Sequence, residues 1–276
     1  MVRRISPLCA SSRLLVFLFI LSSLLFVVRG DAWGQGHRGQ HGTRAPAPHR
    51  APPQYTQAMT GWHASGGRTA PLDAQGRPML VLRTLNRNES VQLVAAGELG
   101  GFSASDLDQA AHVLRAGGGD EHPVDPRTLD IVYRIQAHFH APELRIVSGY
   151  RTPKPNSHSN HGKGRAIDFI VPGTPDEEVA KFAREIGFVG VGVYPTSQFV
   201  HVDIRPRSYF WVDYSGPGKK NREHGILGDL AAASDRRAVA RGDRPIEPFE
   251  IAGDVDAALR ARARVVSTPD VNDEDD

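Results

Sequence analysis

The order of apolar and polar positions predicts one ordered domain between residues 61 and 215, with unpatterned segments on either side. Inside the domain, some stretches carry apolar residues at helical spacing and others are short apolar runs typical of strands. We expect helices from Ser103 or Ser105 to about Ala116, from Pro126 to before Pro142, and from about residue 174 to Ile186. Strands are expected at residues 79–85, 89–94, 144–150, 165–171, 189–194, 199–204 and 209–214. This order predicts an α+β fold with a small, mostly antiparallel sheet and helices packed on it.

The two ends of the chain differ from this domain. Residues 1–30 combine a basic start with a 15-residue apolar run, Leu14 to Val28, and then small residues, which is the pattern of a secretory signal peptide. The run is shorter than the roughly 20 residues that span a bilayer, so cleavage is favoured, although an uncleaved anchor stays open. Residues 31–60 are rich in Gly, Pro and His without apolar periodicity and predict a disordered linker. Residues 216–276 predict a charged tail, in which residues 227–239 could form a helix.

Composition narrows the chemistry. Cys9, the only cysteine among the 276 residues, precedes the apolar run, so the mature chain has no disulfide and any metal site must use His, Asp or Glu. The net charge of +2 gives no electrostatic case for nucleic acid. We therefore expect an exported monomer that meets the membrane only through its signal sequence, if that sequence is retained.

One stretch with unusual chemistry is SNHGKGRAIDF, at residues 159–169. His161 lies in a loop with two glycines, and Asp168 follows seven residues later on a predicted strand, pointing away from its two apolar neighbours. This spacing suits two ligands of one zinc ion. It equally suits a loop that enters a strand, because a single histidine in a loop is usually only polar surface.

A later strand offers a third ligand. In FVHVD, residues 199–203, the valines face the core, so His201 and Asp203 share the opposite face. If this strand pairs beside residues 165–171, His201 completes a His-Asp-His site with an open position for water, as a zinc hydrolase requires. Asp203 then either orients an imidazole from behind or acts as the general base.

Three motifs taken together are similar to a known family. They are SGYR at residues 148–151, S-x-H-x-x-G-x-A-x-D at residues 159–168, and VGVYPTSQFVHVD at residues 191–203. They resemble the zinc D-Ala-D-Ala carboxypeptidase and murein endopeptidase superfamily, and most of all its murein endopeptidase K-like branch. The resemblance covers roughly residues 80–214 and implies a hedgehog or D-Ala-D-Ala peptidase-like fold with zinc on the sheet.

The resemblance also implies the residues of the site. Zinc would be held by His161, Asp168 and His201. The forked guanidinium of Arg151 would hold a carboxylate of the substrate. Tyr150 would lie beside it, and Ser159 would contact the ligand or orient the loop.

These expectations describe a zinc metallopeptidase of the periplasm or cell envelope that cleaves peptidoglycan stem peptides, with cross-links as the favoured bond. The alternative within the enzyme class is D,D- or L,D-carboxypeptidase activity. Several relatives carry an acid or histidine shortly before the last zinc ligand, whereas residues 196–200 offer none. Asp203 or another residue such as His158 would then serve as base. Without a base, the domain would be a non-catalytic, zinc-containing module that binds peptidoglycan.

Overall fold

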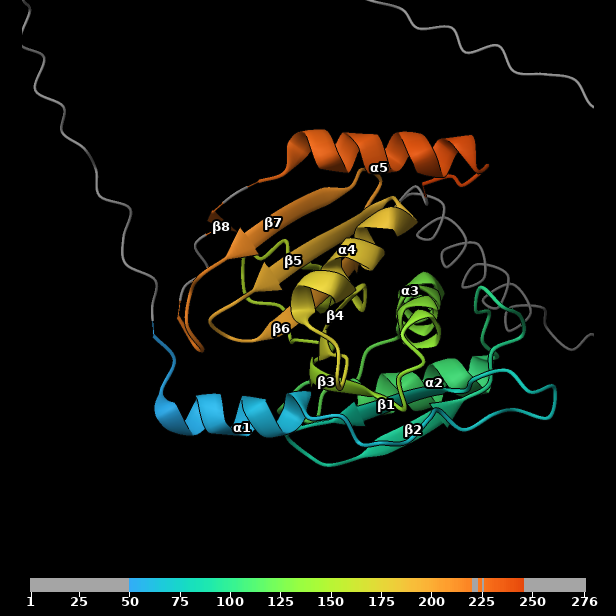
Figure 1. Ribbon diagram of the computed structural model, residues 1–276, viewed down its shortest axis with the longest axis horizontal. Coiled ribbons are helices and arrows are strands. Elements are labelled where there is room, and N and C mark those ends of the chain that lie inside the picture. The colour runs from blue at the N-terminus through green and yellow to red at the C-terminus, as the bar shows by residue number, and fades with distance from the viewer. Residues whose placement is uncertain (1–49, 220–222, 225, 246–276) are drawn as a thin grey trace, which may run out of the picture. The chain divides into compact units, whose positions relative to one another are not determined.

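The computed structural model describes residues 50–219, 223–224 and 226–245 (Figure 1). The predicted signal peptide, most of the predicted linker and the end of the predicted tail lie outside these residues. Among the helices of the described residues, none is both long and apolar enough to cross a membrane.

Eight strands of the described residues form one sheet in the order β2-β1-β3-β4-β6-β5-β7-β8. Their bounds are β1 Leu80–Thr84, β2 Ser90–Leu93, β3 Leu144–Ser148, β4 Ala166–Ile170, β5 Val189–Tyr194, β6 Phe199–Ile204, β7 Tyr209–Asp213 and β8 Glu223–His224. Strands β1 to β7 each lie within a range predicted from the apolar pattern, so those seven predictions are confirmed.

The sheet is mixed, and the expectation of a mostly antiparallel sheet is corrected on this point. β1 runs parallel to β3, and β5 runs parallel to β7, while the other neighbouring pairs are antiparallel. Parallel neighbours require a crossover connection. The chain between β1 and β3 supplies one through α2 and α3, and β7 returns to the side of β5 that β6 does not occupy. Strand order along the sequence does not reveal which strands become neighbours.

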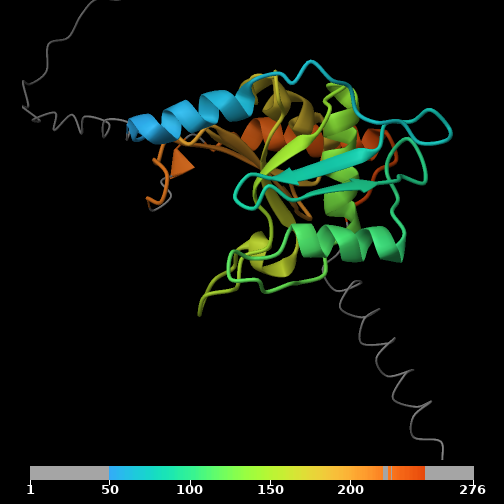
Figure 2. The same cartoon turned by 90° about the horizontal axis from the view of Figure 1, so that it is seen from below.

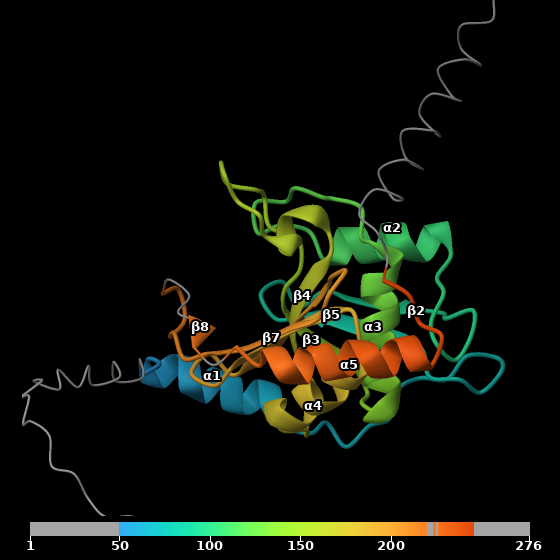
Figure 3. The same cartoon turned by 90° about the horizontal axis from the view of Figure 1, so that it is seen from above.

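The helices are α1 Pro53–His63, α2 Ala104–Val113, α3 Pro126–His138, α4 Asp176–Ile186 and α5 Gly228–Ala240. Side chains cap the N-termini of two of them. Ser103 and Asp106 form a capping box on α2, and Asp125 caps α3 ahead of Pro126. α2 packs on β1 and β2 (Figure 2), and α5 packs on α4 and β7 (Figure 3).

Helix α1 corrects the predicted linker. It includes residues 53–60, which the apolar pattern assigns to disordered chain. Contacts with distant residues fix it: the side chain of Met59 is fully buried, and the Tyr55 hydroxyl donates a hydrogen bond of 2.6 Å to the Ser197 carbonyl. Only Met59 is buried within the helix, which is why no apolar period marks it in the sequence.

Helix α5 lies in the predicted tail, yet it is part of the packed domain. Its residues Ala231 and Ala238 are buried. Its Asp235 accepts hydrogen bonds from the backbone N–H groups of Phe188 and Ser208, each 2.9 Å long. The ordered domain therefore extends beyond its predicted limit at residue 215.

The two faces of the sheet differ at its centre. Alternate apolar side chains of β4 and β6 join the core with α3 and α4, namely Ile167, Phe169, Val200 and Val202. The residues between them, Asp168, His201 and Asp203, point to the opposite face, because successive side chains of a strand alternate. The polar centre thus lies on the face of the sheet away from these two helices.

Candidate metal centre

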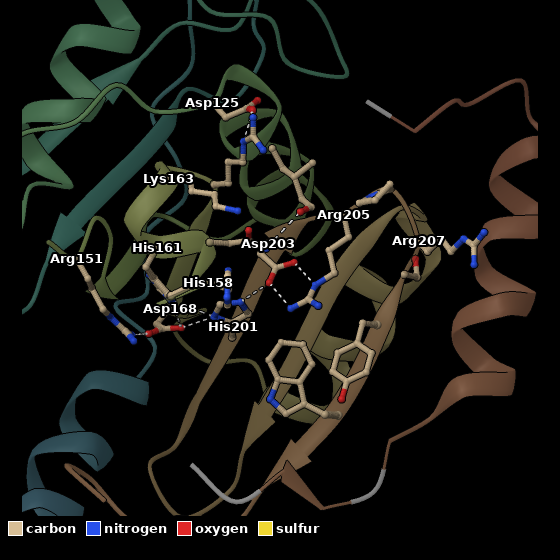
Figure 4. A pocket seen from close by; sticks show the side chains of 18 of the residues that line it. Asp125, Arg151, His158, His161, Lys163, Asp168, His201, Asp203, Arg205 and Arg207 are labelled. Carbon is tan, nitrogen blue, oxygen red and sulfur yellow. Dashed lines mark hydrogen bonds and ion pairs between the residues drawn. The ribbon is translucent and has the colours of Figure 1, made fainter. Parts of the chain in front are cut away.

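Three side chains, two of them close in sequence and the third more than 30 residues further on, meet on this face (Figure 4). Asp168 on β4 lies directly opposite His201 on β6 in the antiparallel register, which confirms the predicted pairing of the two strands. His161 comes from a short 3-10 helix, η1 Asn160–Lys163, which ends at Gly164 in a left-handed conformation (φ +64°). A β carbon on Gly164 would approach the Pro123 carbonyl to 2.1 Å, so the turn that presents His161 requires glycine.

The spacing of the three ligand atoms fits a metal ion. His161 Nε2 lies 3.3 Å from Asp168 Oδ1 and 3.2 Å from His201 Nδ1, and His201 Nδ1 lies 2.8 Å from Asp168 Oδ1. A tetrahedral ion with bonds of about 2.0–2.1 Å separates its ligand atoms by roughly 3.3 Å. All three side chains are at most 9% exposed. Within the described residues, no other group of three or more His, Cys, Asp or Glu side chains has this geometry.

Each histidine is held from behind by a hydrogen bond to its second ring nitrogen. His161 Nδ1 lies 2.7 Å from the Gly149 carbonyl, and His201 Nε2 lies 3.0 Å from Asp203 Oδ2. These acceptors require N–H on Nδ1 of His161 and on Nε2 of His201, so the other nitrogen of each ring faces Asp168, where a cation would bind. The donor set therefore fits a metal ligated by two histidines and one aspartate.

Asp203 is bound on both of its oxygens. Arg205 donates from Nε to Oδ1 over 2.7 Å and from Nη2 to Oδ2 over 2.8 Å, while Oδ2 also faces His201. Burial would raise the pKa of Asp203, but His201 and Arg205 outweigh it and lower the pKa to about 2. Of the two roles that the sequence left open, this geometry favours orienting His201 over acting as a base, because both oxygens already accept hydrogen bonds and the lowered pKa disfavours protonation.

Two glycines of β5 make room for this arrangement. Gly190 and Gly192 pair with Asp203 and His201 across the β5–β6 ladder. A β carbon on Gly190 would lie 2.1 Å from Asp203 Oδ1, and one on Gly192 would lie 2.5 Å from the Trp211 ring. Glycine at alternate strand positions often marks such close approach, so the VGVGV sequence carried a signal that our sequence analysis did not use.

Neighbouring charges set the protonation of the centre when no metal is bound. Burial would raise the pKa of Asp168, but His161, His201 and Arg151 outweigh it and hold the pKa well below its ordinary value. Burial lowers the pKa of His161. For His201 burial acts in the same direction, but its hydrogen bonds to the carboxylates of Asp168 and Asp203 outweigh burial and raise the pKa to about 9. A metal ion must therefore displace a proton from His201 at neutral pH.

A cavity of about 650 Å³, called here the main cavity, opens over the three ligands. Arg151 and Ser159, two of the three predicted substrate contacts, line it together with His158. Arg151 is half exposed and donates to Asp168 Oδ2 and, over 2.8 Å, to Ser148 Oγ. The third predicted contact, Tyr150, is not among the residues that line this cavity; its ring stacks on His122 with centroids 4.9 Å apart.

Residues that the sequence analysis did not assign to the site form the far wall of the main cavity. Arg205 lies over the rings of Tyr209 and Trp211, at 5.0 and 5.4 Å from their centroids. The Trp211 ring lies 5.2 Å from that of His201, so it borders the centre. Their positions depend on β7 lying beside β5, which no local pattern shows.

A buried His-Asp-His set beside an open cavity is the kind of centre that metallopeptidases use. The family model described as peptidoglycan L,D-endopeptidase MepK, a branch of the M15 peptidases, matches residues 73–209. A probable peptidoglycan L,D-endopeptidase MepK from Haemophilus influenzae is 32% identical over 145 residues, covering 46% of this chain and 76% of the relative. The peptidoglycan L,D-endopeptidase MepK of Escherichia coli K12 is 28% identical, covering 48% and 79%.

The chain belongs to this MepK family of M15 peptidases, as the resemblance of its motifs predicted. The matched residues contain every member of the centre, from Arg151 to Arg205. No solved structure matches the chain.

Proposed function

We propose that this protein is an exported zinc metallopeptidase that cleaves the peptide cross-links of peptidoglycan. The observation that carries the proposal is the convergence of His161 Nε2, Asp168 Oδ1 and His201 Nδ1 to within 2.8–3.3 Å of one another beside the main cavity. The two relatives described above are named as peptidoglycan L,D-endopeptidases, one of them as a probable one. We extend to the chain the hedgehog or D-Ala-D-Ala peptidase-like fold that its motifs imply.

Zinc is the proposed metal because two histidines and one carboxylate, with a fourth position open, form a common catalytic zinc site. When bound, such an ion acts as a Lewis acid and lowers the pKa of a coordinated water toward about 7. The remaining steps fall to side chains of the cavity wall.

Arg151 is the proposed anchor for a substrate carboxylate. Its guanidinium is half exposed and reaches Asp168, so it lies at the rim of the centre with part of its fork open to the cavity. A guanidinium matches a carboxylate through two parallel hydrogen bonds. Ser159 lies on the same wall and would contact the bound peptide.

His158 is the proposed proton acceptor. The carboxylates and imidazoles that line the main cavity are otherwise committed: three are ligands, Asp203 pairs with Arg205, and Asp125 lies 3.4 Å from Arg165. His158 has no hydrogen-bond or ion-pair partner among the described residues. A histidine imidazole is the side chain that most often serves as a general base in enzymes.

The proposed location is the periplasm or cell envelope. It rests on the signal-like residues 1–30 and on the peptidoglycan in the names of the relatives.

The charge of the main cavity wall suits an anionic peptide. Of the basic side chains on this wall, Lys163 and Arg207 have no ion-pair partner among the described residues.

The test measures bound zinc and product formation together. The mature protein is incubated with purified muropeptides, next to His161→Ala and, as a matched control, His112→Ala, whose imidazole pairs with Glu121 outside the cavity. We expect about one zinc per chain and shorter muropeptides with wild type and control, and neither with His161→Ala. If the protein binds zinc but forms no new muropeptide, the enzyme proposal fails and a zinc-containing, peptidoglycan-binding module takes its place. Release of single terminal residues only would make it a carboxypeptidase.

A further inference from the structure

A second cavity, of about 350 Å³, lies next to the main cavity, and Arg151 lines both. It is formed at the carboxyl ends of β1 and β3 by Thr84 and Ser148, by the segment from Gly149 to Thr152, and by the C-terminus of α2 with Gly117 and Gly118. Tyr150, the predicted substrate contact that is absent from the main cavity wall, lines this one.

The sheet order puts the two cavities on opposite sides of the metal ligands. The ligands Asp168 and His201 stand on β4 and β6, the middle pair of the sheet. From there the main cavity extends over β6 and β7 to Arg205 and Trp211, whereas the second cavity lies at β1 and β3. Arg151, in contact with Asp168, stands between them. A chain that passes the metal can therefore have one arm in each cavity.

The walls of the two cavities differ in charge. Apart from Arg151, which the two cavities share, the cations of the second cavity are committed to the protein itself: Arg87 donates to the carbonyls of Val113 and Arg115 over 2.8 and 3.2 Å, and the Arg115 side chain pairs with Glu89 at 2.7 Å. What remains toward the cavity is backbone, hydroxyl and aromatic surface, which suits the amides of a peptide more than a free anion.

A carboxypeptidase needs room for one peptide arm beside its centre, because its leaving group is a single residue. An endopeptidase must accommodate chain on both sides of the bond. We infer that the second cavity is the subsite for the second stem peptide of a cross-linked substrate, with the scissile bond held beside Arg151. This inference rests on the proposed function, since it names how the same centre takes a two-armed peptide.

Gly118 lines the second cavity and is suited to a substitution that fills it. A β carbon added there meets no atom within 4 Å, and the backbone is not in the left-handed region, so Gly118→Trp adds its β carbon without a clash. Gly66 has the same open surroundings and lines neither cavity, so Gly66→Trp is the matched control. Zinc content and thermal stability are measured for both to establish that the fold and the centre are intact.

Two substrates distinguish the contribution of the second stem peptide. One is a cross-linked muropeptide dimer, and the other is the same dimer with one stem cut back to its cross-linking residue. We expect Gly118→Trp to lower kcat/KM on the full dimer on the order of tenfold and to leave the truncated substrate unchanged, because binding of a remote arm supports catalysis only when that arm is present. Gly66→Trp should match wild type on both. Equal effects of Gly118→Trp on the two substrates, or none on either, overturn the inference while the endopeptidase function stands.

Wild-type protein that cleaves neither substrate refutes the proposed function, and binding then decides the inference. Affinities of both substrates are measured by titration calorimetry with the same variants. Tighter binding of the full dimer that is lost in Gly118→Trp supports the second subsite. Identical affinities of wild type for the two substrates reject it.

Discussion

Replacing Asp203 by asparagine tests whether this residue positions a ligand or moves a proton. Asp203 accepts from His201 Nε2 at 3.0 Å and from Arg205 at 2.7 and 2.8 Å. Asparagine keeps the volume but has one acceptor oxygen and one donor amide. If the oxygen serves His201, the amide N–H₂ faces the Arg205 donor, and if it serves Arg205 Nε, the amide faces His201.

Either orientation of the amide sets two donors against each other, and a neutral amide oxygen is a weaker acceptor than a carboxylate, so the hydrogen bond that holds His201 weakens. Loss of such an outer partner typically costs about 10- to 100-fold in metal affinity, roughly 1.4 to 2.7 kcal/mol. Part of the unpaired charge on Arg205 is relieved by water, because its side chain is 31% exposed. We therefore expect Asp203→Asn to fold, to bind zinc 10- to 100-fold more weakly, and to regain most of its activity at saturating zinc.

The assay is competition with a chromophoric chelator at fixed pH, followed by muropeptide hydrolysis across a zinc titration. Asp213→Asn is the control for loss of a buried carboxylate, because Asp213 on β7 is fully buried, accepts from Ser215 N–H at 2.7 Å and does not line the main cavity. Unchanged zinc affinity combined with lost activity at saturating zinc would refute the positioning role, and would make Asp203 the base.

Three other outcomes are expected. Without metal, the pKa of His201 is raised from 6.5 to about 9, so protonated His201 stabilises the metal-free fold fully below pH 6.5, and this contribution is lost as pH rises through about 9. Because zinc competes with that proton, the apparent zinc affinity should rise over the same pH interval. A chelator-competition profile that stays flat between pH 6.5 and 9 would contradict this expectation. Gly192→Ala puts a β carbon 2.5 Å from Trp211 and should lower the free energy of unfolding by about 1–3 kcal/mol, or Tm by several degrees. The control Gly66→Ala, whose β carbon meets no atom within 4 Å, should lower it far less. Equal melting temperatures of the two variants would argue against close packing at Gly192. Arg151→Lys, which loses the fork, should retain zinc but lower kcat/KM on the order of tenfold; an unchanged kcat/KM would remove Arg151 from substrate binding.

Local pattern located seven strands and the helices α2 to α4, and it marked Asp168 and His201 as candidate ligands. Apolar runs located β1 to β7, and the two-residue period of β4 and β6 put Asp168 and His201 on polar faces. Motif resemblance then joined His161 to them and pointed to the right family. The sequence analysis did not predict helix α1, because Met59 is its only buried residue and its other stabilising contacts are made with residues distant in the chain.

The amino-acid sequence by itself determined which side chains could serve as ligands and on which face of its own strand each strand-borne ligand points, since side-chain alternation is a property of the backbone. Tertiary structure alone decided that residue 168 lies opposite residue 201, that Asp203 is held by Arg205, and that β7 brings Trp211 beside His201. It also decided that Tyr150 faces a second cavity instead of the first. The physical reason is that strand partners and register are selected by burial summed over the whole sheet, to which each local segment contributes only its pattern.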